Sequence, residues 1–256
     1  MGSRMTDELL LMFAPNIVYW VYSGMYAMLG DMEKYRLHPK GDENKNVPSR
    51  STVIKGVLTL QAMQIAASFV FVMLARDSMS LGEKKPEPSL STMALQFLVA
   101  AVTMDTYQYF MHRFIHSNKF LNKIHSHHHS LVVPYAFGAT YGHPLDGILI
   151  DISGSLVSSM VAGMTPRTSM YFFCFSTVKI VDDHCGLLLP WNPLQRFFSN
   201  NSAFHDVHHQ LYGNKYNYSQ PFFVSWDKLM GTYLPFTVEK REEGGFEVTP
   251  HLMKQA

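Results

Sequence analysis

The sequence predicts an all-α membrane protein, in which four to five membrane segments carry a cytosolic helical cap with a histidine-rich di-metal site. Three observations predict this fold class. Charged residues make up only 16% of the chain, whereas an ordinary soluble domain has about 25%. Several long stretches are apolar enough to enter a bilayer. The 13 histidines among the 256 residues are concentrated in short clusters.

Five apolar segments follow one another along the chain. Residues 9–29 and 57–75 contain no charged side chain, and at 1.5 Å per residue both are long enough to span a bilayer. No small-residue cleavage site follows the first, so we interpret it as a retained span. Residues 93–111 form a third segment, which Asp105 and Gln108 interrupt.

The last two segments, residues 145–164 and 169–181, flank a turn at Pro166 and form a hairpin. This hairpin either crosses the membrane or only enters it. Because charges are costly in lipid, we expect Asp151 and Lys179 to face protein or water.

The distribution of lysine and arginine predicts the orientation. The loop 31–55 holds six of these residues and the loop 76–91 holds three, so the positive-inside rule places the first loop in the cytosol. The chain is cytosolic again after the third segment, and the hairpin returns it to that side. We expect two parts: membrane segments and loops in residues 1–111, and a catalytic domain in residues 112–256 that includes the membrane hairpin 145–181.

Composition excludes several classes of function. A net charge of +1 gives no basic surface for nucleic acid. Cys174 and Cys185 are the only cysteines, too few for a disulfide framework or a cysteine-rich zinc module. A mean hydropathy near zero fits a membrane anchor with a sizeable water-facing part. A soluble protein with several buried apolar helices is the alternative.

The histidine clusters have the spacing of metal ligands on helices. Side chains three and four residues apart share one face of a helix, so each cluster can direct two or three imidazoles to one point. The clusters are His112 and His116 in HRFIH, His125, His128 and His129 in HSHHH, and His205, His208 and His209 in HDVHH. Because zinc usually takes four ligands, these eight indicate two metal ions. A structural zinc site or a run of surface histidines is the alternative.

Two lone histidines extend this candidate set. His143 in YGHPLDG and His184 in DDHCG lie at the same predicted membrane edge as the clusters. His127 would point away from the face that its neighbours share. His38 and His251 have no metal context, and we expect them at the surface.

Four carboxylates are candidates for hydrogen bonds to the ligand rings, which would fix their tautomers. They are Asp105, Asp182, Asp183 and Asp206. For Asp105, a polar contact between helices is the alternative. We expect no catalytic residue beyond the metal ligands. All-imidazole ligation suits zinc, iron, copper or nickel, and a membrane site without a nucleophilic serine or a nucleotide loop favours dioxygen chemistry.

The chain resembles the fatty acid hydroxylase/sterol desaturase superfamily of membrane di-iron enzymes. The resemblance rests on the boxes HxxxH, HxxHH and HxxHH, with membrane segments between the second and the third. Four local stretches are similar to plant sphingoid-base 4-hydroxylases, namely DTYQYFMHRFIH, VPYAFGATYGHP, TVKIVDDHCG and NNSAFHDVHHQLYGNKYNYSQPFF.

This resemblance implies a monooxygenase that uses O2 to hydroxylate carbon 4 of sphinganine, giving phytosphingosine in sphingolipid biosynthesis. It implies a multi-pass protein of the endoplasmic reticulum membrane with its catalytic side in the cytosol. The implied partners are a long-chain sphingoid base, membrane lipid, and cytochrome b5 with its reductase as electron donors.

The implied cofactor is a pair of non-haem iron ions, held by ten histidines. Carried over to this sequence, these are His112, His116, His125, His128, His129, His143, His184, His205, His208 and His209. Another oxygen-dependent member, such as a sterol methyl oxidase, a sterol desaturase or a fatty acyl 2-hydroxylase, remains an alternative. So do a membrane zinc hydrolase and a non-catalytic scaffold.

Overall fold

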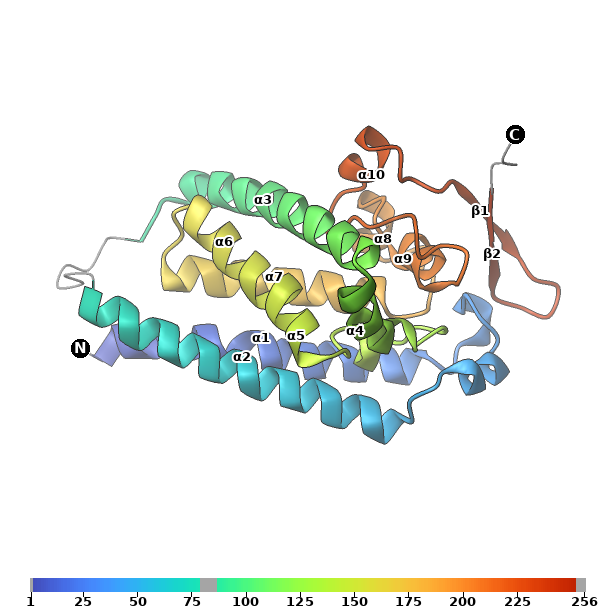
Figure 1. Cartoon of the computed structure of the whole chain (residues 1–256), viewed down its shortest axis with the longest axis horizontal. Helices are drawn as coiled ribbons and strands as arrows, with labels where there is room; N and C mark the ends of the chain where they lie inside the picture. Colours follow the sequence, from blue (N-terminus) through green and yellow to red (C-terminus); the bar gives the residue numbers. More distant parts are fainter. Residues whose placement is uncertain (1, 79–86, 252–256) are drawn as a thin grey trace.

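Long helices run along the molecule and end in a compact cap. The computed structural model describes residues 2–78 and 87–251. The long helices are α1 (Gly2–Leu29), α2 (Arg50–Ser78), α3 (Leu90–Ser117) and α7 (Pro166–Asp183). A fifth rod joins α5 (Pro144–Gly147), the π-helical turn η4 (Ile148–Ile152) and α6 (Ser153–Val161). Figure 1 shows these five rods along the longest axis.

The cap is built from short elements at one end of the rods. They are α4 (Lys119–His129), α8 (Pro193–Phe197), α9 (Ser202–His209), α10 (Ser225–Leu229), β1 (Phe236–Lys240), β2 (Phe246–Pro250) and the 3-10 turns Glu33–Tyr35, Lys40–Lys45 and Ala136–Gly138. The α1–α2 connection lies at this end too, because Leu37 N–H donates to the Gly186 carbonyl and Phe246 N–H donates to that of Arg36. The polar loop predicted over 31–55 ends earlier, since α2 begins at Arg50.

Among the described residues, three helices are long and apolar enough to cross a membrane: Asp7–Leu29, Arg50–Val70 and Pro144–Val161. They correspond to three of the five segments expected from the sequence. The other two lie in α3 and α7, where polar residues such as Asp105 and Lys179 reduce the hydropathy. The number of four to five membrane segments therefore stays a prediction, and so does the division at residue 112, which falls inside α3.

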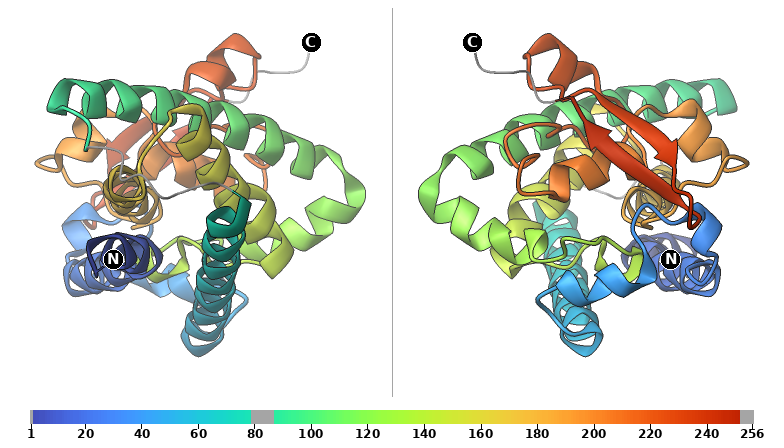
Figure 2. Two further views of the ribbon diagram at one scale, coloured as in Figure 1. Left: turned by 90° about the vertical axis from the view of Figure 1, so that its left-hand side faces the viewer. Right: turned by 90° about the vertical axis from the view of Figure 1, so that its right-hand side faces the viewer.

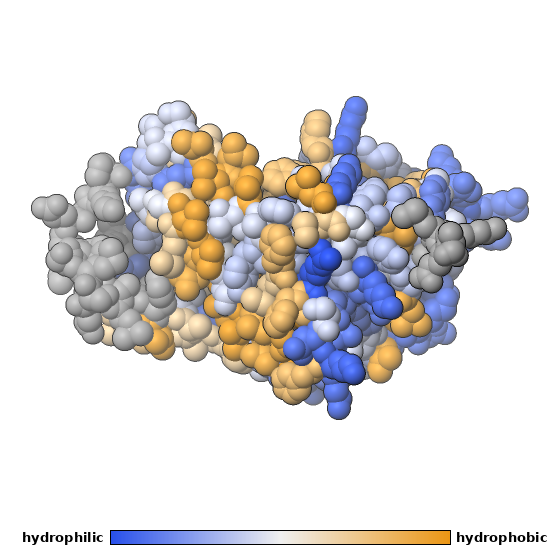
Figure 3. All heavy atoms as spheres, turned by 45° about the horizontal axis from the view of Figure 1, so that its top comes forward, coloured by the Kyte–Doolittle hydropathy of each residue, from blue (hydrophilic) through white to orange (hydrophobic). Residues whose placement is uncertain are grey.

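The long helices expose apolar side chains that a water-soluble protein would bury. Ile17, Val21, Leu58, Phe69 and Leu95 are each more than half exposed. Figure 3 shows apolar residues spread over the rods, whereas hydrophilic residues gather toward the cap end. Contiguous apolar surface of this kind marks contact with lipid, so the structure is that of a membrane protein.

The prediction of an all-α fold is wrong in one place, because the C-terminal residues form a β-hairpin. β1 pairs antiparallel with β2, with Val238 opposite Val248, and the hairpin lies across the cap end (Figure 2, right). The turn contains Gly244 and Gly245 at φ of 102° and 79°, a conformation that glycine adopts readily. Phenylalanine and valine alternate with polar residues in both strands, the pattern of a half-buried sheet.

Two clusters of buried side chains support the site. In the first, Tyr19 and Tyr26 of α1 pack with Val53 and Val57 of α2 and with Val181 of α7. The second is aromatic and joins α3 and α7 to the cap through Met104, Phe172 and Phe222. These clusters fix the ends of α3 and α7 beside the cap.

Candidate metal centre

Helix ends carry the clustered histidines to one place. The last turns of α3, α4 and α9 hold the three boxes, and His184 is the C-cap of α7. Asn118 ends α3 and also caps α4, because its Oδ1 accepts from the backbone N–H groups of Phe120 and Leu121. This tight turn folds α4 back so that its histidines face those of α3. Asn201 caps α9 in the same way.

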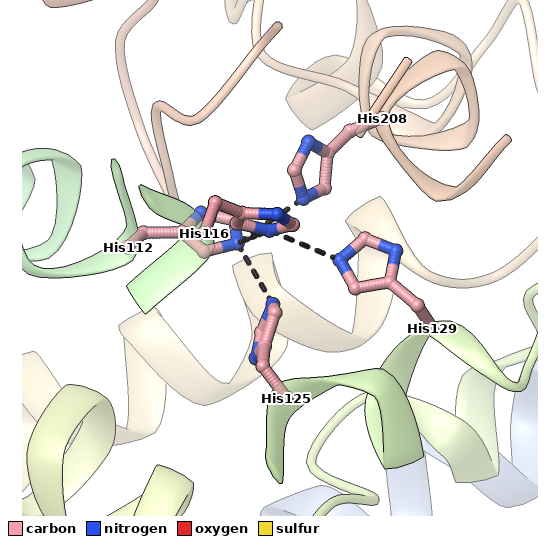
Figure 4. Close-up of side chains that lie close together, drawn as sticks. All are labelled: His112, His116, His125, His129 and His208. Atoms are coloured by element: carbon pink, nitrogen blue, oxygen red, sulfur yellow. Dashed lines mark hydrogen bonds between the residues drawn. The ribbon is translucent and has the colours of Figure 1, made fainter. Parts of the chain in front are cut away.

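The imidazoles form two adjacent groups. The potential ligand atoms within each group lie no more than 4.8 Å apart. The first group, drawn in Figure 4, consists of His112, His116, His125, His129 and His208. The second consists of His128, His184, His205 and His209. The ring centres of His129 and His209 are 4.9 Å apart, so the groups are neighbours.

The Nε2 atoms point inward in both groups. In the first, Nε2 of His112 lies 3.0 Å from that of His125 and 3.1 Å from that of His208. In the second, Nε2 of His205 lies 2.9 Å from that of His184 and 3.1 Å from that of His209. Side chains from distant parts of the chain thus share each centre.

Hydrogen bonds on the other side of the rings fix the tautomers. Nδ1 of His112 lies 2.9 Å from the Tyr218 carbonyl, and Nδ1 of His208 lies 2.7 Å from that of Tyr216. A carbonyl oxygen only accepts, so each Nδ1 carries the proton and donates it. The rings of His128, His184 and His209 donate in the same way to the carbonyls of Tyr141, Ile180 and Leu131.

These tautomers leave lone pairs on the inward Nε2 atoms. Lone pairs at about 3 Å from one another repel, and a cation between them removes the repulsion. Burial and neighbouring imidazoles lower the pKa of His128 to about 4 and hold the pKa values of His205 and His209 well below their usual range. These three rings are therefore neutral at pH 7, the form that binds metal. The donor set fits metal ions.

Nine of the ten predicted ligands lie in the two groups, and His143 does not. The Nδ1 of His143 accepts the backbone N–H of Leu145 and caps α5. Its ring lies beside that of His127, at 5.8 Å between centres. His127 is also outside both groups.

The carboxylate that holds a ligand ring is one that the sequence did not single out. Oδ2 of Asp146 lies 2.6 Å from Nδ1 of His125, and both side chains are buried. The two residues lie on different helices, α4 and α5, so their separation in the sequence does not predict this contact.

The four predicted carboxylates have other partners within the described residues. Asp105 accepts the N–H groups of Phe222 and Phe223. Asp182 accepts from Tyr26 and Asn192, and Asp183 pairs with Lys179. Asp206 pairs with His38, whose Nε2 lies 2.7 Å from its Oδ1. His38 is therefore not the free surface residue expected from the sequence.

A sequence model of the fatty acid hydroxylase family matches residues 97–232, a range that includes every predicted ligand. The chain belongs to the fatty acid hydroxylase family. The resemblance drawn from the histidine boxes is thus confirmed.

Several curated relatives of this fatty acid hydroxylase extend over nearly all of its length. Sphinganine C4-monooxygenase 1 from Arabidopsis thaliana is 54% identical over 253 residues, which cover 98% of this chain and 96% of the relative. The very-long-chain aldehyde decarbonylase GL1-9 from Oryza sativa is 50% identical, with 96% of each chain covered. The sphingolipid C4-hydroxylase SUR2 from Saccharomyces cerevisiae is 36% identical, with 90% of this chain and 72% of the relative covered. No solved structure matches the chain.

Two neighbouring cavities, which share some of their lining residues, lie on one side of the candidate metal centre. The smaller, here called the histidine cavity, is lined by His128, His184 and His205. The larger, here called the helix cavity, has a volume of about 370 Å³ and lies among α1, α2, α3, α6 and α7, with Met12 and Phe173 in its wall. A long apolar chain fits such a cavity.

Proposed function

We propose that this protein is a sphinganine C4-monooxygenase, which places a hydroxyl group on carbon 4 of a long-chain sphingoid base and gives phytosphingosine. The observation that carries this proposal is the 54% identity to the Arabidopsis enzyme of that name over almost the whole of both chains. The paired histidine groups beside an apolar cavity suit the oxidation of a lipid chain. One oxygen atom of O2 enters the substrate, and the other leaves as water with two protons and two electrons.

Two iron ions are the proposed cofactors, with one in each histidine group. His112, His116, His125, His129 and His208 would hold one ion, and His128, His184, His205 and His209 the other. When bound, the irons supply O2 activation and oxidation of an unactivated C–H bond, with electrons from cytochrome b5 and its reductase. The carbonyl partners of the rings keep the Nε2 lone pairs directed at the ions.

His143 completes the proposed set of ten ligands. The preceding residue, Gly142, lines the histidine cavity together with His128, so His143 follows directly after a residue beside the second group. Its addition would give each group five imidazoles.

The other residues position the substrate and exclude water. The helix cavity, whose accessible wall is mainly apolar, holds the alkyl chain, and it adjoins the histidine cavity beside Gln108 and Ile180. The carbon atoms nearest the polar head then lie closest to the metal centre. Holding the reacting carbon there supplies orientation, the main contribution of protein to such a reaction.

Complementation in yeast tests the proposal. The chain is expressed in a Saccharomyces cerevisiae strain that lacks its own sphingolipid C4-hydroxylase, and long-chain bases are measured by mass spectrometry. We expect phytosphingosine to reappear, to depend on O2, and to be absent with the His208→Ala variant. Expression without phytosphingosine would refute the assignment.

The rice relatives supply a second candidate, conversion of a very-long-chain aldehyde to a hydrocarbon, because they are 50% identical over 96% of the chain. The same yeast membranes distinguish the two. Hydrocarbon from an added C26 aldehyde, without phytosphingosine from sphinganine, would favour this second candidate. Methyl sterol and free fatty acid are tested in parallel as substrates of more distant family members.

We further propose that the protein lies in the endoplasmic reticulum membrane with its cap in the cytosol. The cap and the basic α1–α2 connection lie at the same end of the rods (Figure 1), as the charge rule requires. An Asn-Gly-Thr glycosylation site inserted at the exposed turn beside Glu242 should stay unmodified, and one inserted in residues 79–86 should be glycosylated. Glycosylation beside Glu242 but not in residues 79–86 would show that the cap faces the lumen and would refute the proposed orientation.

A further inference from the structure

One of the candidate membrane spans contains a carboxyl group. Asp151 belongs to the π-helical turn of the rod Pro144–Val161. Within residues 2–78 and 87–251, which the structure describes, the Asp151 side chain forms neither a hydrogen bond nor an ion pair. The ionisable groups that interact with it are Tyr19 and Asp146, and neither carries a positive charge. An ionisable residue at membrane depth is costly and is usually retained for a function, and π-helical turns are frequent at functional sites.

Asp151 stands where the two cavities meet. Four residues line both the histidine cavity and the helix cavity: Gln108, Thr140, Asp151 and Ile180. Gln108 is only 2% exposed, and its buried Oε1 atom has no hydrogen-bond partner in the part of the chain that the structure describes. The junction therefore offers a carboxyl group and an amide oxygen between the helix cavity and the imidazoles.

These groups fit a ligand with a cationic head on a long apolar chain. We propose that Asp151 binds the ammonium group of a free long-chain base, and that Oε1 of Gln108 accepts a hydrogen bond from the same head group. The identity of the base rests on the proposed function. Asp151 then selects the free amine over N-acylated bases, because an amide nitrogen carries no charge and would leave the carboxylate without a cationic partner.

The position of the amine agrees with hydroxylation at carbon 4. In sphinganine the nitrogen is on carbon 2 and the rest of the alkyl chain begins beyond carbon 4. With the ammonium at the junction, the chain extends into the helix cavity, and carbon 4 stays beside the opening to His128, His184 and His205. Asp151 is thus a positioning and specificity residue that does not bind the metal ions.

Binding and turnover by the full-length protein in nanodiscs test this assignment. Binding of radiolabelled sphinganine and of N-acetylsphinganine is measured without O2, so that no product forms, and KM and kcat are measured with O2. Asp151→Asn should weaken sphinganine binding and raise its KM by roughly 30-fold or more, the effect of removing one partner of a buried charge pair. Binding of N-acetylsphinganine should stay within about threefold of wild type.

Two further variants separate recognition from folding. Asp151→Glu keeps the charge and should retain the preference for the free base. Asp31→Asn removes an exposed carboxylate that pairs with Lys40 and lines neither cavity, so this variant should bind both ligands as wild type does.

If Asp151→Asn weakened the binding of sphinganine and of N-acetylsphinganine equally, Asp151 would have a structural role and the proposal would be overturned. Unchanged sphinganine binding in that variant, or a wild-type preference for N-acetylsphinganine, would overturn it as well. Binding of sphinganine that depends on Asp151 without any carbon 4 product would instead refute the proposed function and leave this assignment standing.

Discussion

Asp146 holds the ring of His125, with its Oδ2 atom 2.6 Å from Nδ1. His125 lies in the last turns of α4, and Asp146 lies in α5, at the start of a candidate membrane span. The carboxylate fixes the proton on Nδ1 and directs the Nε2 lone pair of His125 toward His112, 3.0 Å away. Partners of this kind orient metal ligands and increase their basicity.

The first prediction follows from this contact. Asp146→Asn keeps the shape of the side chain but removes the charge, so metal affinity should fall by roughly 10- to 100-fold. Iron per protein, measured by mass spectrometry after dialysis against graded chelator, checks the result. Asp42→Asn in the surface loop is the matched control and should keep its metal. Equal iron retention in both variants would contradict the role given to Asp146.

The second prediction concerns His208, a member of the first histidine group. Its Nε2 atom lies 3.1 Å from Nε2 of His112. His208→Ala should abolish phytosphingosine formation and reduce bound metal, because no other described side chain replaces its Nε2. Membrane insertion and the helical circular dichroism spectrum should not change. His127→Ala, in the neighbouring box but outside both groups, should keep metal and activity. Full activity of His208→Ala would remove it from the ligand set.

The sequence predicted the parts of this centre that depend on local geometry. His205 and His209 are four residues apart, and this spacing places both in the second group, as any helix there would. The expectation that each cluster serves one point is wrong for both HxxHH boxes, because His208 turns to the first group and His128 is separated from His125 and His129. The pairs His125–Asp146 and His38–Asp206 depend on how separate elements pack, across 21 and 168 residues, and no local pattern encodes that packing.

The hairpin at the C-terminus is a different case. Phe236 and Val238 alternate with polar residues before the two glycines, as Phe246 and Val248 do after them. This signal of a β-hairpin is present in the sequence, so local pattern alone could have predicted these two strands.

The third prediction decides between nine and ten ligands. His143→Asn preserves an acceptor for the Leu145 N–H, because asparagine is itself a good N-cap residue, but it removes the imidazole. If His143 binds metal as proposed, the variant should lose bound iron while α5 stays intact. His143→Ala loses both cap and ring and serves for comparison. Wild-type iron content in His143→Asn would reduce the set to nine.

The fourth prediction concerns a buried ion pair in α7. Nζ of Lys179 pairs with Asp183 and donates to the carbonyl of Asn200, and the lysine side chain is fully buried. Lys179→Met leaves the Asp183 carboxylate without its cation, so the protein should lose about 3–5 kcal/mol of stability. Thermal unfolding in detergent measures this loss. Adding Asp183→Asn to Lys179→Met should recover part of it, and no recovery would show that the charge is not the cause.

The fifth prediction is a pH dependence of stability that arises from His38. Burial lowers the pKa of His38, but the hydrogen bond and the charge of Asp206 outweigh it, so the pKa is raised above its usual 6.5. A group whose pKa is raised by folding stabilises the fold fully below its unfolded pKa, and this contribution is lost as the pH rises through the folded pKa. His38 should therefore stabilise the cap more at pH 6 than at pH 9.

His38→Gln tests this dependence by thermal unfolding at both pH values. At pH 6 the variant should lose about 1.5–3 kcal/mol, the contribution of a hydrogen bond to a charged group, and at pH 9 only about 0.5–1.5 kcal/mol. The difference between variant and wild type at each pH cancels the titration of every group that the two proteins share. His251→Gln, at an exposed position, should change stability at neither pH. A greater loss at pH 9 than at pH 6 would mean that His38 is neutral in the fold and that Asp206 does not hold its proton.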